Sequence, residues 1–194
     1  MAVSSANTFV ATPDKVSGGL SFWKPGATVT RPTDATTALT GASNGGYISE
    51  DGVTKTVDAS DENIIAWGGD TVRVVRTEHN LSYTFTFLES LNGDVLKLIY
   101  GENNVDIDPV SGAIEIRESS KLQPRMPFVI DTVDGDRRRR EFIPNAQLAV
   151  SGDVTFVHSD VVRYECTLTA FPDPQNPEFK SFSWVEGTEE PVTP

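Results

Sequence analysis

The sequence predicts a mainly β protein, a β-sandwich or partly closed barrel with one flanking α-helix and extended arms at both ends. Two stretches, 81–87 and 162–170, alternate strictly between apolar and polar side chains. Because successive side chains of a strand point to opposite faces, each stretch predicts a strand with one buried face. A single segment, at about 92–100, has its apolar residues at helical spacing instead.

Shorter stretches of the same period predict further strands at 72–74, 113–117, 128–133, 147–150 and 154–157. Two turns predict hairpins, because Asp and Gly tolerate positive φ. Asp51-Gly52 would join 47–48 to 53–57. Asp134-Gly135-Asp136 would join 128–133 to 137–143.

The helix is predicted from both of its ends as well as from its apolar stripe. Asn92 is a good N-cap, Asp94 complements the positive end of the helix, and Gly101 suits the left-handed position after the last turn. The stripe between them would pack on the sheet and consists of Val95, Leu96, Ile99 and Tyr100. A second, shorter helical turn is predicted at 60–66, with Ser60 as its cap.

The two ends of the chain differ from its middle. Residues 1–45 carry little periodicity and much Ser, Thr, Gly, Pro and Ala, whereas 171–194 are rich in Pro and aromatic residues. We therefore predict an N-terminal arm (1–45), a β domain (46–170) and a C-terminal arm (171–194). We expect the C-terminal arm to be extended and not to form a packed strand. The aromatic residues of the second arm need a surface to dock on, either the protein's own sheet or a neighbouring subunit.

Composition excludes several classes of protein. The 194 residues carry 16 Lys and Arg against 28 Asp and Glu, a net charge of −12, so diffuse binding to the outside of DNA or to an anionic membrane is not expected. One Cys excludes an internal disulfide framework. No stretch has the length of a membrane span or the pattern of a secretory signal.

A search for catalytic and metal-binding motifs predicts no enzyme, no metal and no cofactor. The sequence has no nucleophile elbow, phosphate-binding loop, zinc-protease or dinucleotide motif. The acidic stretch from Asp106 fails the spacing of a calcium loop, because Arg117 stands where the bidentate acid belongs. Cys166 falls on the apolar side of its strand, which favours a small core residue over a nucleophile.

The strongest charge run consists of Arg137, Arg138, Arg139 and Arg140. It is compatible with a phosphate-binding patch or with a solvated hairpin. A third interpretation, which we favour, is that it meets an acidic surface on a neighbouring copy and so offsets self-repulsion in an anionic chain.

Several stretches resemble the major tail (tail tube) proteins of long, non-contractile-tailed bacteriophages (siphophages), most closely versions from phages of actinobacteria. The resemblance covers about residues 15–190. It rests on the stretches Tyr47-Ile48-Ser49-Glu50-Asp51-Gly52-Val53, Ile65-Ala66-Trp67-Gly68-Gly69-Asp70, Thr77-Glu78-His79, Val95-Leu96-Lys97, Tyr100-Gly101, Phe171-Pro172-Asp173 and Phe182-Ser183-Trp184.

The resemblance implies a structural virion protein, located in the tail and assembled in the host cytoplasm. Six copies would form a ring, and rings would stack into a tube around the tape measure protein. The tube would end at tail terminator and distal tail proteins and would conduct phage DNA without binding it specifically. The inner wall would be a continuous barrel to which each subunit contributes about four strands.

Within that picture we assign two groups of residues. A lumen that conducts DNA suits carboxylates and hydroxyls, so we expect Glu50, Thr54, Thr56, Asp58 and Glu115 to line it. Contacts between subunits or rings are expected from the four arginines and from Tyr47, Phe179, Phe182 and Trp184. The alternative function is a β-sandwich binding module that recognises a glycan or a protein. A jelly-roll hydrolase is supported only by the abundance of Asp and Glu.

Overall fold

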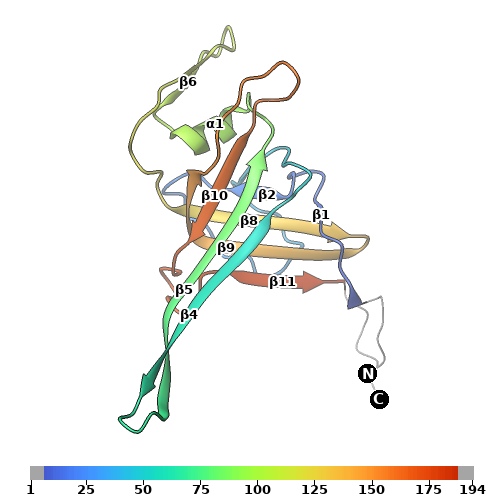
Figure 1. Cartoon of the computed structure of the whole chain (residues 1–194). Helices are drawn as coiled ribbons and strands as arrows, with labels where there is room; N and C mark the ends of the chain where they lie inside the picture. The colour runs from blue at the N-terminus through green and yellow to red at the C-terminus, as the bar shows by residue number, and fades with distance from the viewer. Residues whose placement is uncertain (1–6, 188–194) are drawn as a thin grey trace.

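The computed structural model describes residues 7–187 as one nine-stranded sheet, a separate two-stranded hairpin and one helix (Figure 1). The sheet follows the order β3-β2-β8-β9-β10-β5-β4, with β1 paired to β8 and β11 paired to β9. Its strands are β1 (Thr12–Pro13), β2 (Leu20–Phe22), β3 (Ser43–Asn44), β4 (Thr54–Ile65), β5 (Thr71–Phe87), β8 (Met126–Asp134), β9 (Arg137–Val150), β10 (Tyr164–Ala170) and β11 (Phe182–Glu186). The mainly β prediction is confirmed, and the sheet is open rather than closed into a barrel.

Strand β9 joins two halves of the sheet. Its first half pairs with β8 on one edge and β11 on the other, whereas its last residues pair with β10. The β8–β9 pair consequently runs across the direction of β4, β5 and β10 (Figure 1). All of these pairings are antiparallel.

The main core lies on one face of β5. Leu81, Tyr83, Phe85 and Phe87 are all buried there, as the alternation of 81–87 predicts. Helix α1 (Gly93–Tyr100) adds buried residues to the same core. The side chain of Asn92 accepts bonds from the first backbone amides of α1, so the predicted helix and its N-cap are confirmed. Gly101 follows the last turn with a positive φ of 101°, but its ψ of 144° is not the left-handed conformation that we predicted.

A smaller core covers the opposite face of the β8–β9 pair. Trp23, Val129 and Phe142 are buried there, and Phe182 and Trp184 of β11 pack against them. Both ends of the chain thus contribute to the folded body: β2 lies inside the sheet and β11 along β9. Our prediction that 171–194 form an arm without a packed strand is wrong at β11, because β9 offers that segment an edge to pair with. Residues 188–194 lie outside the described residues.

Three local predictions are also wrong. Residues 60–66 do not form a helical turn, because β4 runs through Ile65 and its backbone pairs with β5 instead. Residues 154–157 form no strand, because β9 and β10 pair directly with each other and leave that connection no edge. The Asp51-Gly52 turn exists, but Ile48 and Thr54 on either side of it both pair with β5 rather than with each other. The hairpin at Gly135 is confirmed.

The separate hairpin consists of β6 (Val105–Ile107) and β7 (Ile114–Ile116). It projects from one end of the molecule, next to α1 and the loop between β9 and β10 (Figure 1). The long β4–β5 hairpin projects from the opposite end. The two ends of the molecule therefore carry different structures.

Candidate assembly surfaces

A continuous polar face extends across β4, β5, β10 and the end of β9. Cross-strand pairing aligns its side chains in two rows, because residues opposite each other in a sheet share a face. The rows are Thr54, Thr84, Thr167 and Ala149, and Thr56, Ser82, Thr169 and Gln147. Neither row contains a positive charge, and Asp58 and Glu165 lie beside them on the same face. The face is therefore rich in hydroxyl groups and edged by carboxylates.

The other side of these four strands is apolar, as period-two alternation requires. Tyr83, Leu168 and Leu148 form one buried row, and Leu81, Ala170 and Ala146 form the next. The register is thus strongly specified, because a slip of one residue would expose the core and bury the hydroxyls.

Our five predicted lumen residues do not all fall on the polar face. Thr54, Thr56 and Asp58 lie on it, and Glu50 lies in the turn just before β4. Glu115 is on β7, in the separate hairpin, so the structure does not bring it together with the others. Sequence reasoning missed Thr167 and Thr169, although the alternation of 162–170 already placed them opposite the core side chains.

The β4–β5 hairpin projects from the body, and every residue from Thr54 to Asn80 in its two strands is exposed. Its end exposes several apolar side chains, and the Trp67 side chain in the turn is fully exposed, at 106%. The other exposed apolar residues there are Ile64, Ile65, Val72 and Val74. A concentration of exposed apolar groups marks an interaction surface.

Ion pairs hold the hairpin at two levels. Near its middle Arg76 donates to both carboxylate oxygens of Asp61, at 2.8 and 3.3 Å, and this hydrogen bonding lowers the pKa of Asp61. At its base Lys55 and the Tyr83 hydroxyl both donate to the buried carboxylate of Glu141 on β9. Burial, and then this bond to Glu141, raises the pKa of Tyr83 well above its usual range. The base of the hairpin is therefore anchored to the body.

The opposite end of the molecule exposes a different apolar set. Tyr47, Leu91, Val110 and Phe156 are all largely exposed. Leu91 follows β5, Val110 is in the β6–β7 turn, and Phe156 is in the loop between β9 and β10 (Figure 1). Tyr47, one of the predicted contact residues, is tied to the start of the 88–92 segment through the bond from the Leu88 amide to its carbonyl oxygen.

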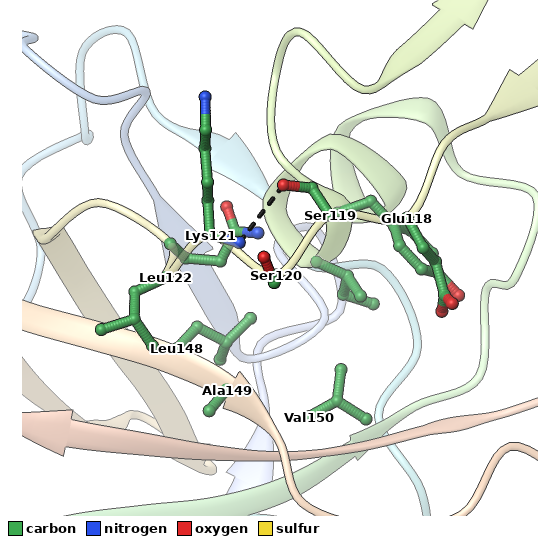
Figure 2. Close-up of a pocket in the computed structure, with 11 residues that line it drawn as sticks. Glu118, Ser119, Ser120, Lys121, Leu122, Leu148, Ala149 and Val150 are labelled. Atoms are coloured by element: carbon green, nitrogen blue, oxygen red, sulfur yellow. Dashed lines mark hydrogen bonds between the residues drawn. The ribbon is translucent and has the colours of Figure 1, made fainter.

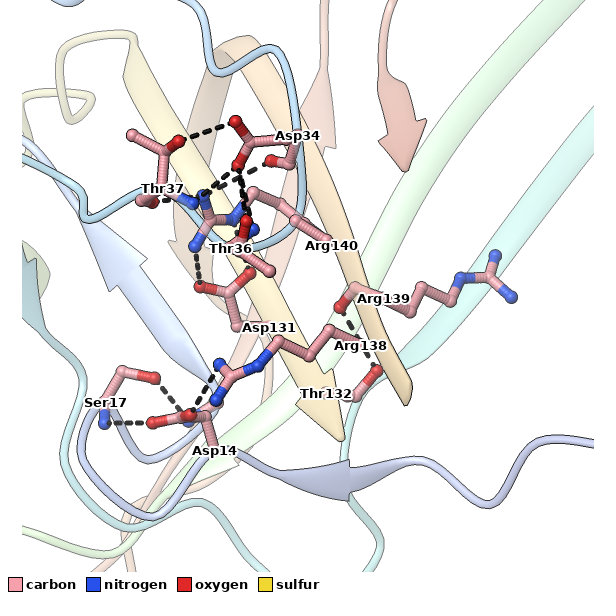
Figure 3. Close-up of polar contacts among 12 residues, drawn as sticks. Asp14, Ser17, Asp34, Thr36, Thr37, Asp131, Thr132, Arg138, Arg139 and Arg140 are labelled. Atoms are coloured by element: carbon pink, nitrogen blue, oxygen red, sulfur yellow. Dashed lines mark hydrogen bonds and ion pairs between the residues drawn. The ribbon is translucent and has the colours of Figure 1, made fainter. Parts of the chain in front are cut away.

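The arginine run lies at the start of β9, and its members have different surroundings (Figure 3). Arg140 is buried and makes a bidentate pair with Asp131, at 2.7 and 2.9 Å. Arg138 reaches Asp14 at 3.6 Å, and Arg137 pairs with Asp134. Arg139 extends away from these partners, half exposed, with the Glu141 carboxylate 3.9 Å away. The structure therefore uses Arg140 inside the subunit and presents Arg139 at the surface.

The predicted aromatic contact residues lie along and before β11. Phe182 and Trp184 stack with ring centroids 6.3 Å apart and cover the smaller core. The Arg31 guanidinium lies 4.6 Å from the Phe182 ring centroid. Phe179 remains half exposed. Of the two surfaces that we considered for these aromatics, the protein's own sheet receives Phe182 and Trp184.

Residues 7–187 contain no group of three or more His, Cys, Asp or Glu side chains placed to hold a metal ion. Burial raises the pKa of the Cys166 thiol to about 12, so the thiolate that acts as a nucleophile is not formed near neutral pH. In this part of the chain no helix is both long and apolar enough to cross a membrane.

An open β-sheet with a continuous polar face and exposed apolar groups at both ends of the molecule is typical of a structural protein that assembles with copies of itself. Residues 20–193 match the family model described as phage tail tube protein, and the chain belongs to that family. It is therefore a non-enzymatic structural protein of the phage tail, located in the virion and assembled in the host. No curated protein sequence matches the chain.

Proposed function

We propose that six copies of this chain close into a ring and that the polar face of β4, β5, β10 and β9 lines the lumen. The observation that carries the proposal is this face, in which two rows of mainly hydroxyl side chains cross four strands without a positive charge. DNA is repelled by carboxylates and finds no cationic group to bind in these rows. A duplex would therefore pass along such a wall without being held.

The dimensions of a closed ring agree with this role. Six copies of four strands make 24 strands, which at ~4.8 Å spacing and ~40° tilt close a circle with a backbone diameter of roughly 48 Å. Side chains of about 5 Å on each wall leave a lumen of some 38 Å, wide enough for a duplex of ~20 Å with its water and ions. At the same strand spacing and tilt, adding or removing one subunit changes the diameter by about 8 Å.

Stacking of the rings would use the two different ends of the subunit. The apolar tip around Trp67 and the end that carries Leu91 and Phe156 are unlike surfaces on opposite sides of the body. An interface between unlike surfaces is heterologous, and it repeats without limit unless a rotation closes it. Rings would therefore add head to tail into a tube that surrounds the tape measure protein, ends at tail terminator and distal tail proteins, and delivers the genome.

The remaining predicted contact residues lie on exposed parts of the subunit. Arg139, Tyr47 and Phe179 all have exposed side chains that a neighbouring copy would cover. We keep these three as the contact residues of choice, because Arg140, Phe182 and Trp184 already have partners within the subunit.

Electron microscopy of concentrated purified protein tests the proposal. We expect rings and hollow tubes with sixfold symmetry and a lumen of about 38 Å. A different lumen of about 30 or 46 Å would indicate five or seven copies on the same geometry and correct the number six. A chain that stays monomeric at all salt and protein concentrations, even with added tube fragments as seeds, would overturn the proposal.

A further inference from the structure

The β4–β5 hairpin is a long projection that is attached to the body at its base (Figure 1). Strand β10 pairs with β5 as far as the Leu81–Ala170 pair. From Asn80 to the tip, β5 pairs with β4 alone among residues 7–187. At ~3.4 Å per residue, the stretch from His79 to Trp67 spans roughly 40 Å, so a rotation of about 10° at the base displaces the tip by about 7 Å. The direction of the hairpin therefore depends on the contacts at its base.

The segment before β11 supplies one of these contacts. The Lys180 ammonium group donates a hydrogen bond to the backbone carbonyl oxygen of His79. His79 lies on β5 just past Leu81, where the pairing with β10 has ended. Lys180 thus holds β5 at the point where the neighbouring strand no longer does.

The next residue reaches a second contact at the same base. Ser181 interacts with the hydroxyl group of Tyr83, which donates to the buried carboxylate of Glu141 on β9. Lys55 of β4 donates to the same carboxylate. Both strands of the hairpin are therefore held at their base, β4 through Lys55 and β5 through Tyr83 and the carbonyl group that Lys180 binds.

The loop that carries Lys180 is itself fixed to the body. The Asn145 side chain of β9 donates to the carbonyl oxygen of Pro172 at 2.8 Å. The Asp173 amide closes the loop by donating to the carbonyl oxygen of Phe179, also at 2.8 Å, and Asp173 is buried. Directly after this loop, β11 pairs with β9. Lys180 consequently reaches the hairpin from a well-defined position.

We propose that residues 179–181 are a latch that fixes the direction of the β4–β5 hairpin, with Lys180 as its positioning residue. The role of this latch in assembly rests on the proposed function, because the hairpin carries the apolar tip that we assign to ring stacking. Its effect on the free subunit does not depend on that function.

The place of the latch along the hairpin supports this role. Strands β4 and β5 first depart from regular register between Ser60 and Asp61. A bulge bends and twists a strand pair, so the hairpin is most easily redirected there. His79 is opposite Ala59, directly before the bulge, and the Arg76–Asp61 ion pair follows directly after it. The latch therefore holds the hairpin on the body side of its point of bending.

The Lys180 contact contributes more to direction than to stability. A carbonyl group at an exposed strand edge bonds to water when a side-chain donor is removed, so the net loss of free energy is small. The contact does, however, connect two segments that are 101 positions apart in the chain. Loss of Lys180 should therefore change the direction of the hairpin while leaving the unfolding temperature nearly unchanged.

Distances between paired spin labels test the latch in the free subunit. One label is attached to Val72→Cys near the hairpin tip and the other to Ala149→Cys on β9, and both positions are exposed. Ala149 lines an open groove of about 500 Å³ beside segment 118–123, on the part of β9 that pairs with β10, so a label has room there without touching the latch (Figure 2). Native Cys166 is buried and is not labelled.

Pulsed electron paramagnetic resonance then measures the distribution of distances between tip and body. With Lys180 present, we expect one narrow distribution. Several distances, or one broad distribution, in this background would overturn the latch without any further substitution.

Lys180→Met removes the contact and keeps a side chain of similar length. We expect the distribution to become about twofold wider or to shift by about 5 Å or more, which corresponds to roughly 7° at the base. The unfolding temperature should stay within about 2 °C of wild type. Lys180→Arg, whose guanidinium group can donate to the same carbonyl oxygen, should restore the narrow distribution.

The matched control is Lys24→Met. It removes another exposed lysine, which pairs with Glu102 at 3.4 Å and not with the hairpin, so the distribution should not change. An unchanged distribution in Lys180→Met, or an equal widening in Lys24→Met, would overturn the latch.

Seeded assembly separates the latch from the proposed function. Lys180→Met subunits should extend tube fragments at least ~5-fold more slowly than wild type, because only the fraction with a correctly directed hairpin can bind. If they extend tubes at the wild-type rate although their distances are wider, the role of the latch in assembly is wrong and the tail tube role stands. If the wild-type chain forms neither rings nor tubes, the proposed function falls, whereas the distances in the free subunit still decide the latch.

Discussion

Replacing Arg140 by Met should strongly destabilise the subunit, whereas the same change at Arg139 should not. The Arg140 side chain is only 6% exposed and donates to Asp131 at 2.7 and 2.9 Å. It also donates to the carbonyl oxygens of Thr37, at 2.6 Å, and Asp34, at 3.4 Å. Met fills similar space but leaves a largely buried carboxylate and two carbonyl groups without their donor.

The expected loss follows from these contacts. Removing one partner of a buried ion pair costs about 3–5 kcal/mol, because the other charge stays buried and uncompensated. For a chain of this length each kcal/mol lowers the melting temperature by roughly 2–4 °C, so we expect a decrease of about 6–20 °C. Arg139 is half exposed, with its carboxylate neighbour 3.9 Å away, so Arg139→Met should change stability by no more than about 0.5 kcal/mol.

Thermal and urea unfolding of dilute, unassembled subunit, followed by circular dichroism, measures both variants. A double variant, Arg140→Met with Asp131→Leu, should be less destabilised than the sum of the two single changes, because it leaves no unpaired charge. The reasoning is refuted if Arg140→Met unfolds within about 1 kcal/mol of wild type, or if Arg139→Met loses as much as Arg140→Met.

Two further substitutions test assembly, and two experiments test titratable groups. Trp67→Ser should leave subunit stability unchanged but reduce tube yield in sedimentation. Val16→Ser replaces another largely exposed apolar residue elsewhere and should not reduce the yield; equal yields from the two variants would contradict a role for the hairpin tip. Arg139→Glu should impair assembly without destabilising the subunit. Unimpaired assembly would indicate that Arg139 is only a solvent-exposed residue of the hairpin and makes no contact with a neighbouring copy. Hydrogen bonds from the Thr37 hydroxyl, and then from the Thr37 and Thr36 amides, lower the pKa of Asp34 in the folded protein. The ionised Asp34 carboxylate therefore stabilises the fold above the pKa of about 3.8 that it has in the unfolded chain, and this stabilisation is lost as the pH falls below that value. Asp34→Asn should therefore flatten the acid side of the stability–pH curve, and an unchanged acid slope would contradict this. Burial raises the pKa of Cys166 to about 12, so a thiol reagent at pH 8 should label it only after unfolding; rapid labelling of folded subunit would show that the strand opens.

Local sequence patterns predicted those parts of the fold that depend only on residues close together in the chain. The alternation of 81–87 placed Tyr83 in the core and Thr84 on the polar face, and both positions are confirmed. The caps of α1 were readable because Asn92 and Gly101 act on backbone groups within one turn. The composition of the polar face was readable too, because a strand's period determines which side chains it presents together.

Patterns did not predict the assignments that depend on partners far away in sequence. Residues 60–66 have helical signals, yet they pair with β5, because a long neighbouring strand satisfies their backbone groups. The four arginines look alike in sequence, yet only Arg140 finds a buried carboxylate together with carbonyl groups of the segment around Asp34. Glu186 accepts a bond from the Ala35 amide across 151 positions of the chain, which no local pattern contains.

The sequence by itself determined the β class, the faces of the main strands, the helix with its caps, and an anionic, hydroxyl-rich surface without catalytic groups. These features follow from side-chain period, from capping chemistry and from charge, which act over a few residues or over the whole composition. Only the tertiary structure decided that the hydroxyls of three strands form one continuous wall, and which of the four arginines is buried. Pairing across long stretches of chain decides these points, and it depends on where the whole fold brings each strand.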